Sequence, residues 1–191
     1  MAEHAAEEFQ NQKPKKTRKI FNLFVEIVVI LAIVFGLSFL LRTFVFGAYA
    51  IPSASMETTI MTGDMVFSEK VSYYVRAPQA GDIVTFTDPE TPNRTLIKRV
   101  IATEGQTITL KDGKVLVDGV ALDEEYTNGK PSYELASTIT FPYTVPQGYV
   151  WVMGDNRTNS QDSRYFGAIP VSSITGRAAI IYWPLNHLGL L

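Results

Sequence analysis

Residues 20–46 read IFNLFVEIVVILAIVFGLSFLLRTFVF, and this apolar stretch separates a short leading segment from a long following one. From Ile20 to Leu41 it would make a helix about 33 Å long, enough to cross a bilayer core of about 30 Å. We therefore predict a single transmembrane helix over 20–46, in the cell membrane. A basic cluster precedes it (Lys13, Lys15, Lys16, Arg18 and Lys19). The positive-inside rule then predicts a cytoplasmic tail over 1–19 and an extracytoplasmic domain over 47–191.

Two alternatives for this stretch stay open. Ala48-Tyr49-Ala50 has the small-x-small pattern at which signal peptides are cut. The apolar run is, however, longer than the roughly 7–15 residues usual in a signal peptide, and Arg42 also precedes the alanines. The other alternative is a buried core helix, but the run has no polar face and a long β-rich segment follows it. The length of the apolar run and the absence of a polar face therefore favour a retained anchor.

Composition excludes several classes of protein and site. The 191 residues include 17 Lys+Arg and 19 Asp+Glu, and 46% are hydrophobic. A disordered chain would have fewer apolar residues, and a nucleic-acid-binding protein would carry an excess of basic charge. The absence of cysteine excludes disulfides and a cysteine nucleophile. The two histidines, His4 and His187, are too few for a multi-histidine metal site.

After residue 46 the sequence alternates short β-prone runs with turn signals, and it shows no helical period longer than two turns. Asp112-Gly113 between two such runs is a strong hairpin signal. The predicted strands are 82–86, 95–102, 107–110, 114–119, 149–154 and 176–184. The fold class is therefore mainly β, with a barrel-like or sandwich-like domain after the single transmembrane helix.

Three stretches hold candidate site residues. In IPSASMETTI (51–60), small residues around Ser55 would let a serine present its hydroxyl and its own N–H to a carbonyl group, although serine-rich loops are usually only loops. In TLIKRVIA (95–102), strict alternation places Lys98 with Leu96 and Val100, and Arg99 with Ile97 and Ile101. One of the two cations must then lie on a partly apolar face. A buried lysine can become neutral and accept a proton, whereas arginine cannot, but an exposed edge-strand lysine is the alternative.

The third stretch, MGDNRTNSQDSRYFG (153–167), is dense in side chains that bond to the backbone in turns. Arg157 and Arg164 are available to pair with its aspartates, so a loop with a purely structural role is the default interpretation. Taken together and in this order, the IPSxSM, IKRV and GDNRxxSxDSR segments resemble type I signal peptidase (bacterial leader peptidase). GDIV (81–84) matches a further short stretch of that family. The single anchor and short domain are similar to the smaller Gram-positive members.

The resemblance implies a membrane-bound serine endopeptidase with a Ser/Lys dyad and an acyl-enzyme, which needs no metal or other cofactor. By position, Ser55 matches the nucleophile and Lys98 the general base. Ser53 matches the serine that completes the oxyanion hole with the Ser55 N–H. Ser160 matches the serine that orients the lysine. Asp162 and Arg164 match residues that hold the site together.

Four positions depart from the family pattern. Thr58 stands where proline is usual, and Ala102, Glu104 and Gln106 replace other usual residues in the stretch after the IKRV segment. None of them removes a catalytic group. We expect them to affect local loop geometry and substrate range.

The implied substrates are signal peptides of secretory preproteins, which carry small residues at the first and third positions before the cut. Ile51, Met56, Ile60 and Ile97 flank the dyad in sequence and are candidate walls of shallow substrate pockets, with ordinary core as the alternative. The lipid bilayer is the other expected partner, and nucleic acid is not. Two rival functions are a membrane-tethered binding domain without activity and a regulatory or self-processing Ser/Lys protease. Self-cleavage between Ala50 and Ile51 is a side hypothesis, and Pro52 disfavours it.

Overall fold

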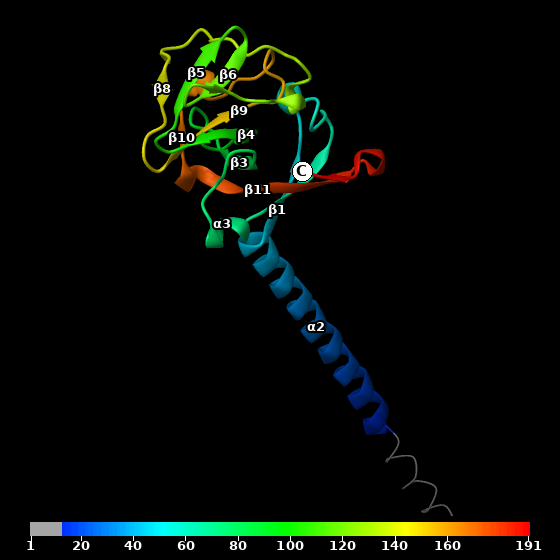
Figure 1. Ribbon diagram of the computed structural model, residues 1–191. Coiled ribbons are helices and arrows are strands. Elements are labelled where there is room, and N and C mark those ends of the chain that lie inside the picture. The colour runs from blue at the N-terminus through cyan, green and yellow to red at the C-terminus, as the bar shows by residue number, and fades with distance from the viewer. Residues whose placement is uncertain (1–12) are drawn as a thin grey trace, which may run out of the picture. The chain divides into compact units, whose positions relative to one another are not determined.

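The computed structural model describes residues 13–191, as two units divided between Thr43 and Phe44 (Figure 1). Residues 1–12 of the predicted tail, with His4, lie outside the described residues. Helix α2, Lys13–Phe44, makes up the described part of the first unit and ends at the first residue of the second. Its segment Arg18–Phe44 is long and apolar enough to cross a membrane, and none of its most apolar window is buried in protein.

The helix ends two residues before the predicted limit of 46, because Phe46 already belongs to strand β1. Strand β1 pairs antiparallel with β2, and Ala48 lies opposite Phe67. The Ala48-Tyr49-Ala50 sequence is therefore part of a sheet. A cut after Ala50 would remove a whole strand from that sheet, which favours a retained anchor over a cleaved signal peptide.

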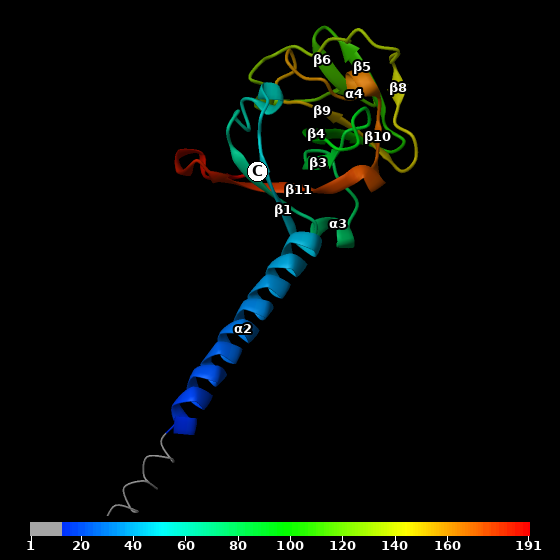
Figure 2. The same cartoon turned by 180° about the vertical axis from the view of Figure 1, so that it is seen from behind.

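The second unit is built from two antiparallel sheets, which confirms the mainly β prediction (Figure 2). The larger sheet has the order β1-β2-β11-β3-β4-β9-β10, with β12 added on β11, and the smaller has the order β7-β6-β5-β8. The strands of the larger sheet are β1 Phe46–Ala50, β2 Met65–Glu69, β3 Ile83–Thr87, β4 Thr95–Thr103, β9 Tyr149–Met153, β10 Ile169–Pro170, β11 Ile174–Trp183 and β12 Gly189–Leu190. Those of the smaller sheet are β5 Thr107–Lys111, β6 Lys114–Val117, β7 Val120–Ala121 and β8 Tyr143–Thr144.

The helices of this unit are all short: η1 Ala54–Met56, α3 Ser72–Val75, η2 Glu125–Thr127, α4 Ser163–Phe166, η3 Val171–Ser173 and η4 Leu185–His187. At the predicted hairpin, Asp112 and Gly113 have φ values of 51° and 75° between β5 and β6. Positive φ at both central residues is the conformation for which Asp-Gly is favoured, so this prediction is confirmed.

The core that matters for the site lies between the larger sheet and the segment that connects β1 to β2. It contains Ile51, Met56, Ile60, Val66, Ile83, Ile97, Ala178 and Ile181. This connecting segment, residues 51–64, carries η1 and is named the Ser55 loop below. Its two ends are joined by backbone hydrogen bonds from Ile51 N–H to Asp64 O (2.9 Å) and from Gly63 N–H to Ile51 O (2.8 Å).

Candidate active site

Lys98 lies in the middle of the larger sheet. Strand β4 is flanked by β3 and β9, and Lys98 pairs with Val84 of β3. Because the strand is covered on both faces, Lys98 is only 3% exposed. Its neighbour Arg99, on the other face, forms a two-bond ion pair with Asp155 at 2.9 and 2.7 Å. The edge-strand alternative for Lys98 is therefore wrong.

The Nζ of Lys98 donates a hydrogen bond to the Oγ of Ser55 at 2.8 Å, and another to the carbonyl oxygen of Ile97 at 3.0 Å. Burial lowers the pKa of Lys98 to about 8 from its usual 10.5, since a buried ammonium loses its hydration. The carboxylates of Asp162, Asp155 and Asp88 act in the opposite direction, and the Arg94 guanidinium lowers the pKa further. A substantial fraction of this amine is thus neutral at mildly alkaline pH.

Ser53 lies beside the nucleophile candidate, with its Oγ 3.5 Å from that of Ser55. Its side chain is exposed, whereas Ser55 is buried in the η1 turn. The backbone of Ser53 is extended and Ser55 is the middle residue of the η1 turn, and the 3.5 Å contact places the two hydroxyls side by side. This arrangement suits a pair in which one hydroxyl attacks and the other donates to a developing oxyanion.

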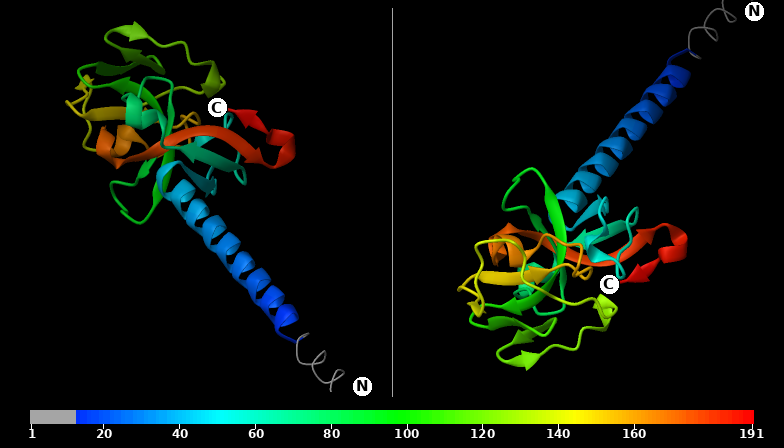
Figure 3. Two further views of the ribbon diagram at one scale, coloured as in Figure 1. Left: turned by 90° about the horizontal axis from the view of Figure 1, so that it is seen from below. Right: turned by 90° about the horizontal axis from the view of Figure 1, so that it is seen from above.

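The Ser55 loop is held by residues 154–156, which follow β9. The Asn156 side-chain amide donates to the carbonyl oxygen of Ala54 at 2.9 Å. The backbone N–H of Asn156 donates to the carbonyl oxygen of Ser55 at 3.1 Å. Lys130 fixes the Asn156 amide with a 2.8 Å bond from Nζ to Oδ1. Lys130 comes from the excursion 118–133 after β6, drawn in yellow-green in Figure 3. Sequence reasoning treated Asn156 only as a turn residue and did not identify Lys130.

Gly154 is a further residue that sequence reasoning missed. A Cβ at this position would come closer than 3.0 Å to both the Ser160 Oγ and the Ser55 carbonyl oxygen, a distance that real Cβ atoms essentially never show. Only glycine lets the backbone after β9 approach Ser55 so closely. A glycine in the GDN sequence is compatible with such a close approach, but the sequence does not show that Ser55, far away in the chain, is the residue approached.

Asp162 and Arg164 form a fully buried pair joined by two hydrogen bonds of 2.9 Å. Asp162 also accepts from the Gly154 N–H at 3.0 Å and caps α4, so it anchors the segment that carries Gly154. Arg157, in contrast, does not pair with an aspartate as expected. It forms its ion pair with Glu124, because the excursion 118–133 folds back over this loop.

The Ser160 hydroxyl does not make the expected bond to Lys98. Its Oγ is buried and has no hydrogen-bond partner among the described residues. The Ser160 Oγ lies against the Gly154 backbone instead, and the Lys98 amine bonds to Ser55 and to the carbonyl of Ile97.

Two cavities flank the Ser55–Lys98 pair. One, of about 160 Å³, is mostly apolar and is lined by Ile51 and Ile97 with Tyr49, Ala50, Pro52 and Leu96. The other, of about 290 Å³, is polar and is lined by residues that include Asp88, Arg94, Asn159 and Gln161. Ser53, Ser55 and Lys98 line both. Met56 and Ile60 line neither, because they are fully buried in the core, so their assignment as pocket walls is corrected.

Within residues 13–191, none of the four departures from the family pattern forms a side-chain bond to Ser55 or Lys98. The Thr58 hydroxyl donates to the carbonyl oxygen of Tyr126 at 3.3 Å, which ties the Ser55 loop to η2. Glu104 accepts from the Gly148 N–H at 2.7 Å, and Gln106 accepts from the Thr103 N–H at 2.9 Å. Ala102 is buried in the core beneath the smaller sheet. All four support local geometry.

The chain is similar to several known proteins. A crystal structure of a signal peptidase I from Enterococcus faecalis V583 matches with a TM-score of 0.48 and 32% identity, over 54% of this chain and 97% of that one. Signal peptidase I of Leptolyngbya laminosa is 40% identical over 158 residues, 79% of this chain and 75% of that protein. Probable signal peptidase I-1 of Synechocystis sp. is 41% identical over 173 residues, 87% of this chain and 86% of that protein. A family model described as signal peptidase, peptidase S26, matches residues 22–183. With a match over most of its length and these relatives, the chain belongs to the S26 family of signal peptidases and is a peptidase.

Proposed function

We propose that this signal peptidase cleaves preproteins after a small-x-small motif, with Ser55 as the nucleophile and Lys98 as the general base. The observation that carries the proposal is the 2.8 Å contact between the Ser55 Oγ and the Nζ of a lysine that is only 3% exposed. A neutral amine at this distance has a lone pair available for the hydroxyl proton. Neither histidine is required.

In the first half of the reaction, the Ser55 Oγ attacks the scissile carbonyl carbon while Lys98 takes its proton. The oxyanion is met by the Ser55 N–H and the Ser53 hydroxyl, each donor being worth about 3 kcal/mol of barrier. Lys98 then returns the proton to the leaving amine as the peptide bond breaks, and the acyl group stays on Ser55. In the second half, Lys98 takes a proton from water as the water attacks the ester, and gives it to the Ser55 Oγ as the ester bond breaks and the new carboxyl end is released.

The apolar cavity is the proposed site for the small side chains before the cut. Ile51 and Ile97 line it, and its volume of about 160 Å³ disfavours large side chains. An extended preprotein can also pair with an exposed strand edge. In the proposed topology the 1–19 tail is cytoplasmic, 20–46 crosses the membrane and 47–191 lies outside. Confining enzyme and substrate to one membrane surface raises their effective concentration.

The test is cleavage of a purified precursor by the detergent-solubilised full chain. Lys98→Arg keeps the positive charge but cannot act as a base, and Ser55→Ala removes the nucleophile. Each is expected to lower the rate by about 10⁴-fold or more. Lys111→Arg, on β5, is the matched control and should cleave normally. Substantial cleavage by Lys98→Arg would refute the role of the base.

The same incubation separates this proposal from a self-processing protease. The Ala50–Ile51 bond joins the end of strand β1 to a buried residue. The backbone N–H and the carbonyl oxygen of Ile51 are both hydrogen-bonded. We therefore expect N-terminal sequencing to find an intact chain while the precursor is converted to its mature length. A new N-terminus at Ile51 would instead support self-processing.

A further inference from the structure

His187, which the proposed mechanism does not use, lies in η4, in the hairpin between β11 and β12 that Figure 1 draws in red. Its ring Nδ1 lies 2.7 Å from the Oδ1 of Asp64. Asp64 is only 1% exposed, whereas the His187 side chain is 38% exposed. An ionised carboxylate can only accept hydrogen bonds, so the shared hydrogen belongs to Nδ1. His187 therefore joins this hairpin to a buried carboxylate at the end of the Ser55 loop.

Asp64 connects His187 to both ends of the Ser55 loop. Its Oδ2 accepts from the backbone N–H of Met61 at 2.8 Å, and its own N–H donates to the Met61 carbonyl oxygen at 3.1 Å. Its carbonyl oxygen accepts from the backbone N–H of Ile51 at 2.9 Å. The carboxylate thus binds His187 and Met61, while the backbone of the same residue binds Ile51.

Ile51 is the residue through which this contact reaches the proposed substrate site. Its side chain lines the apolar cavity of about 160 Å³, and its carbonyl oxygen accepts from the Gly63 N–H at 2.8 Å. Both backbone groups of Ile51 are therefore held by residues 63 and 64. A displacement of Asp64 would move Ile51, and with it one wall of the cavity.

The hairpin that carries His187 is itself held on the core. Leu191, which follows β12, packs against the buried cluster that contains Ile51, and its N–H donates to the carbonyl oxygen of Ala179 at 3.0 Å. Strand β12 also pairs with β11. These contacts do not involve the histidine ring, so the hairpin is a fixed support from which His187 can position Asp64.

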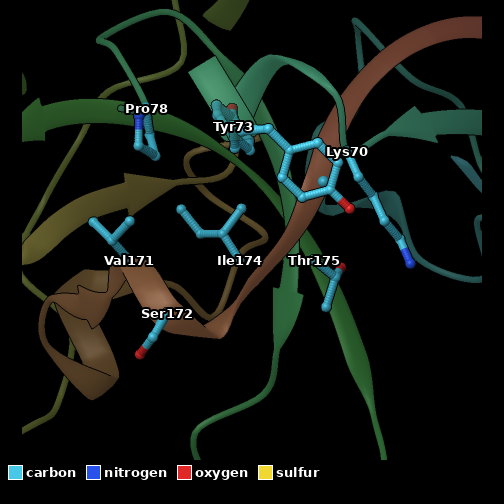
Figure 4. A pocket seen from close by; sticks show the side chains of 9 residues that line it. Lys70, Tyr73, Pro78, Val171, Ser172, Ile174 and Thr175 are labelled. Atoms are coloured by element: carbon cyan, nitrogen blue, oxygen red, sulfur yellow. The ribbon is translucent and has the colours of Figure 1, made fainter. Parts of the chain in front are cut away.

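A further cavity, of about 360 Å³, opens between α3 and the start of β11 (Figure 4). The Tyr73 hydroxyl on its wall donates to Asp82 at 3.2 Å, and the Thr175 hydroxyl donates to the carbonyl oxygen of Thr85 at 3.1 Å. These polar groups are already used within the domain. The bond from His187, in contrast, acts on a wall of the proposed substrate site.

We propose that His187, acting through Asp64, fixes Ile51 and so sets the width of the apolar cavity that rejects large side chains before the cut. The inference rests on the proposed function, because it takes this cavity as the site for those side chains. The histidine does not line the cavity. It is therefore a positioning residue rather than a catalytic one.

The test compares two precursors that differ only at the third position before the cut, with alanine in one and leucine in the other. The detergent-solubilised full chain cleaves each, and kcat/KM is measured for both. The wild type should prefer alanine. His187→Leu removes the donor to Asp64 and should lower this preference by about three- to tenfold, because an apolar pocket discriminates by its fit to the side chain.

Two variants separate positioning from a general effect of mutation in η4. His187→Asn places an amide N–H close to the position of Nδ1 and should restore the preference for alanine. Asn186→Leu makes the same kind of change at the neighbouring exposed residue and should keep the wild-type preference. Thermal unfolding of the same samples measures separately any loss of stability from leaving the Asp64 carboxylate without its partner.

An unchanged preference in His187→Leu would overturn the inference, and so would an equal loss of kcat/KM for both precursors, which indicates a structural role only. A His187→Asn enzyme that behaves like His187→Leu would also overturn it. If His187→Leu does not fold, His187→Ala takes its place and must show the same loss of preference. Ser55→Ala and Lys98→Arg are measured with the same precursors. Cleavage by either would overturn the proposed Ser/Lys pair, whereas an unchanged preference with both inactive would overturn only the role of His187.

Discussion

Lys98 and Ser55 meet at 2.8 Å, but the protein holds them in opposite ways. Lys98 lies in a nine-residue strand paired on both sides, so the regular backbone bonds of the sheet fix its position. Ser55 lies in a three-residue turn of an irregular loop, which is held by the Asn156 side chain and by close contact with Gly154.

This difference predicts where mutations act. Around Lys98, a single side-chain change leaves the strand in place and alters only the chemistry of the amine. Around Ser55, a change in one supporting side chain can move the nucleophile itself, and a displacement of about 1 Å can cost about 10²-fold in rate. Mutations near Lys98 should therefore change the pKa of its amine, whereas mutations of the residues that hold the Ser55 loop should change the position of Ser55.

The largest expected effect comes from Lys98→Met. Cleavage should fall by about 10⁴-fold or more, while the free energy of unfolding at pH 7 should rise by an amount on the order of 1–3 kcal/mol, because a buried charge is removed. The pKa of Lys98 is about 8 in the folded chain and near 10.5 when exposed. Between these values the unfolded chain binds a proton that the folded chain does not, so wild-type stability should rise with pH through this window. Denaturant midpoints of the variant and the wild type, measured at pH 7 and at pH 10, check the stabilisation and its pH dependence. A Lys98→Met variant less stable than the wild type at pH 7 would contradict the burial of a charge at this position.

Gly154→Ala should have the next largest effect. The added methyl group would come within 3.0 Å of both the Ser55 carbonyl oxygen and the Ser160 Oγ, so the backbone that carries the proposed nucleophile must shift. We expect kcat to fall by about 10²-fold or more with a smaller change in KM. Gly36→Ala is the control, since nothing lies within 4 Å of the added atom. An active Gly154→Ala enzyme would show that the loop can shift without cost.

Asn156→Ala removes the amide that holds the Ala54 carbonyl but leaves the backbone bond to Ser55. Loss of one of the two supports should lower kcat by about 10- to 100-fold, with KM for a precursor nearly constant. Asn186→Ala, at an exposed position in η4, is the comparison variant. If KM rises and kcat is unchanged, Asn156 contacts substrate instead of positioning the nucleophile.

Lys130→Gln tests the same support one step further away. The amide of Gln can still donate to Asn156, but the charge-assisted bond of 2.8 Å is lost. We expect a loss of about three- to tenfold in kcat, and rescue by Lys130→Arg. Lys114→Gln in β6 should show no change. An effect as large as that of Asn156→Ala would mean that the excursion 118–133 has collapsed.

Much of this fold follows from the sequence, because its long strands carry local signals. The runs at 95–102 and 176–184 are apolar, β-branched and bounded by turn residues, and both are strands in the structure. Strand β1 was missed for a physical reason. Its FGAYA sequence continues the hydropathy of the helix, so Phe46 was assigned to the span.

The reacting residues were predicted from local motifs, whereas their supports depend on contacts between distant segments. Nothing near Lys130 in the sequence indicates that it reaches Asn156, and nothing near Gly154 shows that the Ser55 carbonyl lies against it. The apolar candidates could not be separated for the same reason. Ile51 and Met56 look alike in sequence, but only tertiary packing decides that the first lines a cavity and the second is enclosed.

The smallest expected effect sharpens the claim about the base. Arg94 lines both cavities with Lys98, pairs with the buried Asp88 and lowers the pKa of Lys98. Arg94→Gln removes this cation and leaves the Asp88 carboxylate unpaired, and both changes raise that pKa. The rise of kcat/KM with pH should therefore move to higher pH, by roughly 0.3 pH units because the guanidinium is half-exposed and screened. The shift should shrink in 1 M salt, with the Debye length falling to about 3 Å, and Arg76→Gln should not cause it. A profile that moves to lower pH would mean that a group other than the Lys98 amine limits the rate.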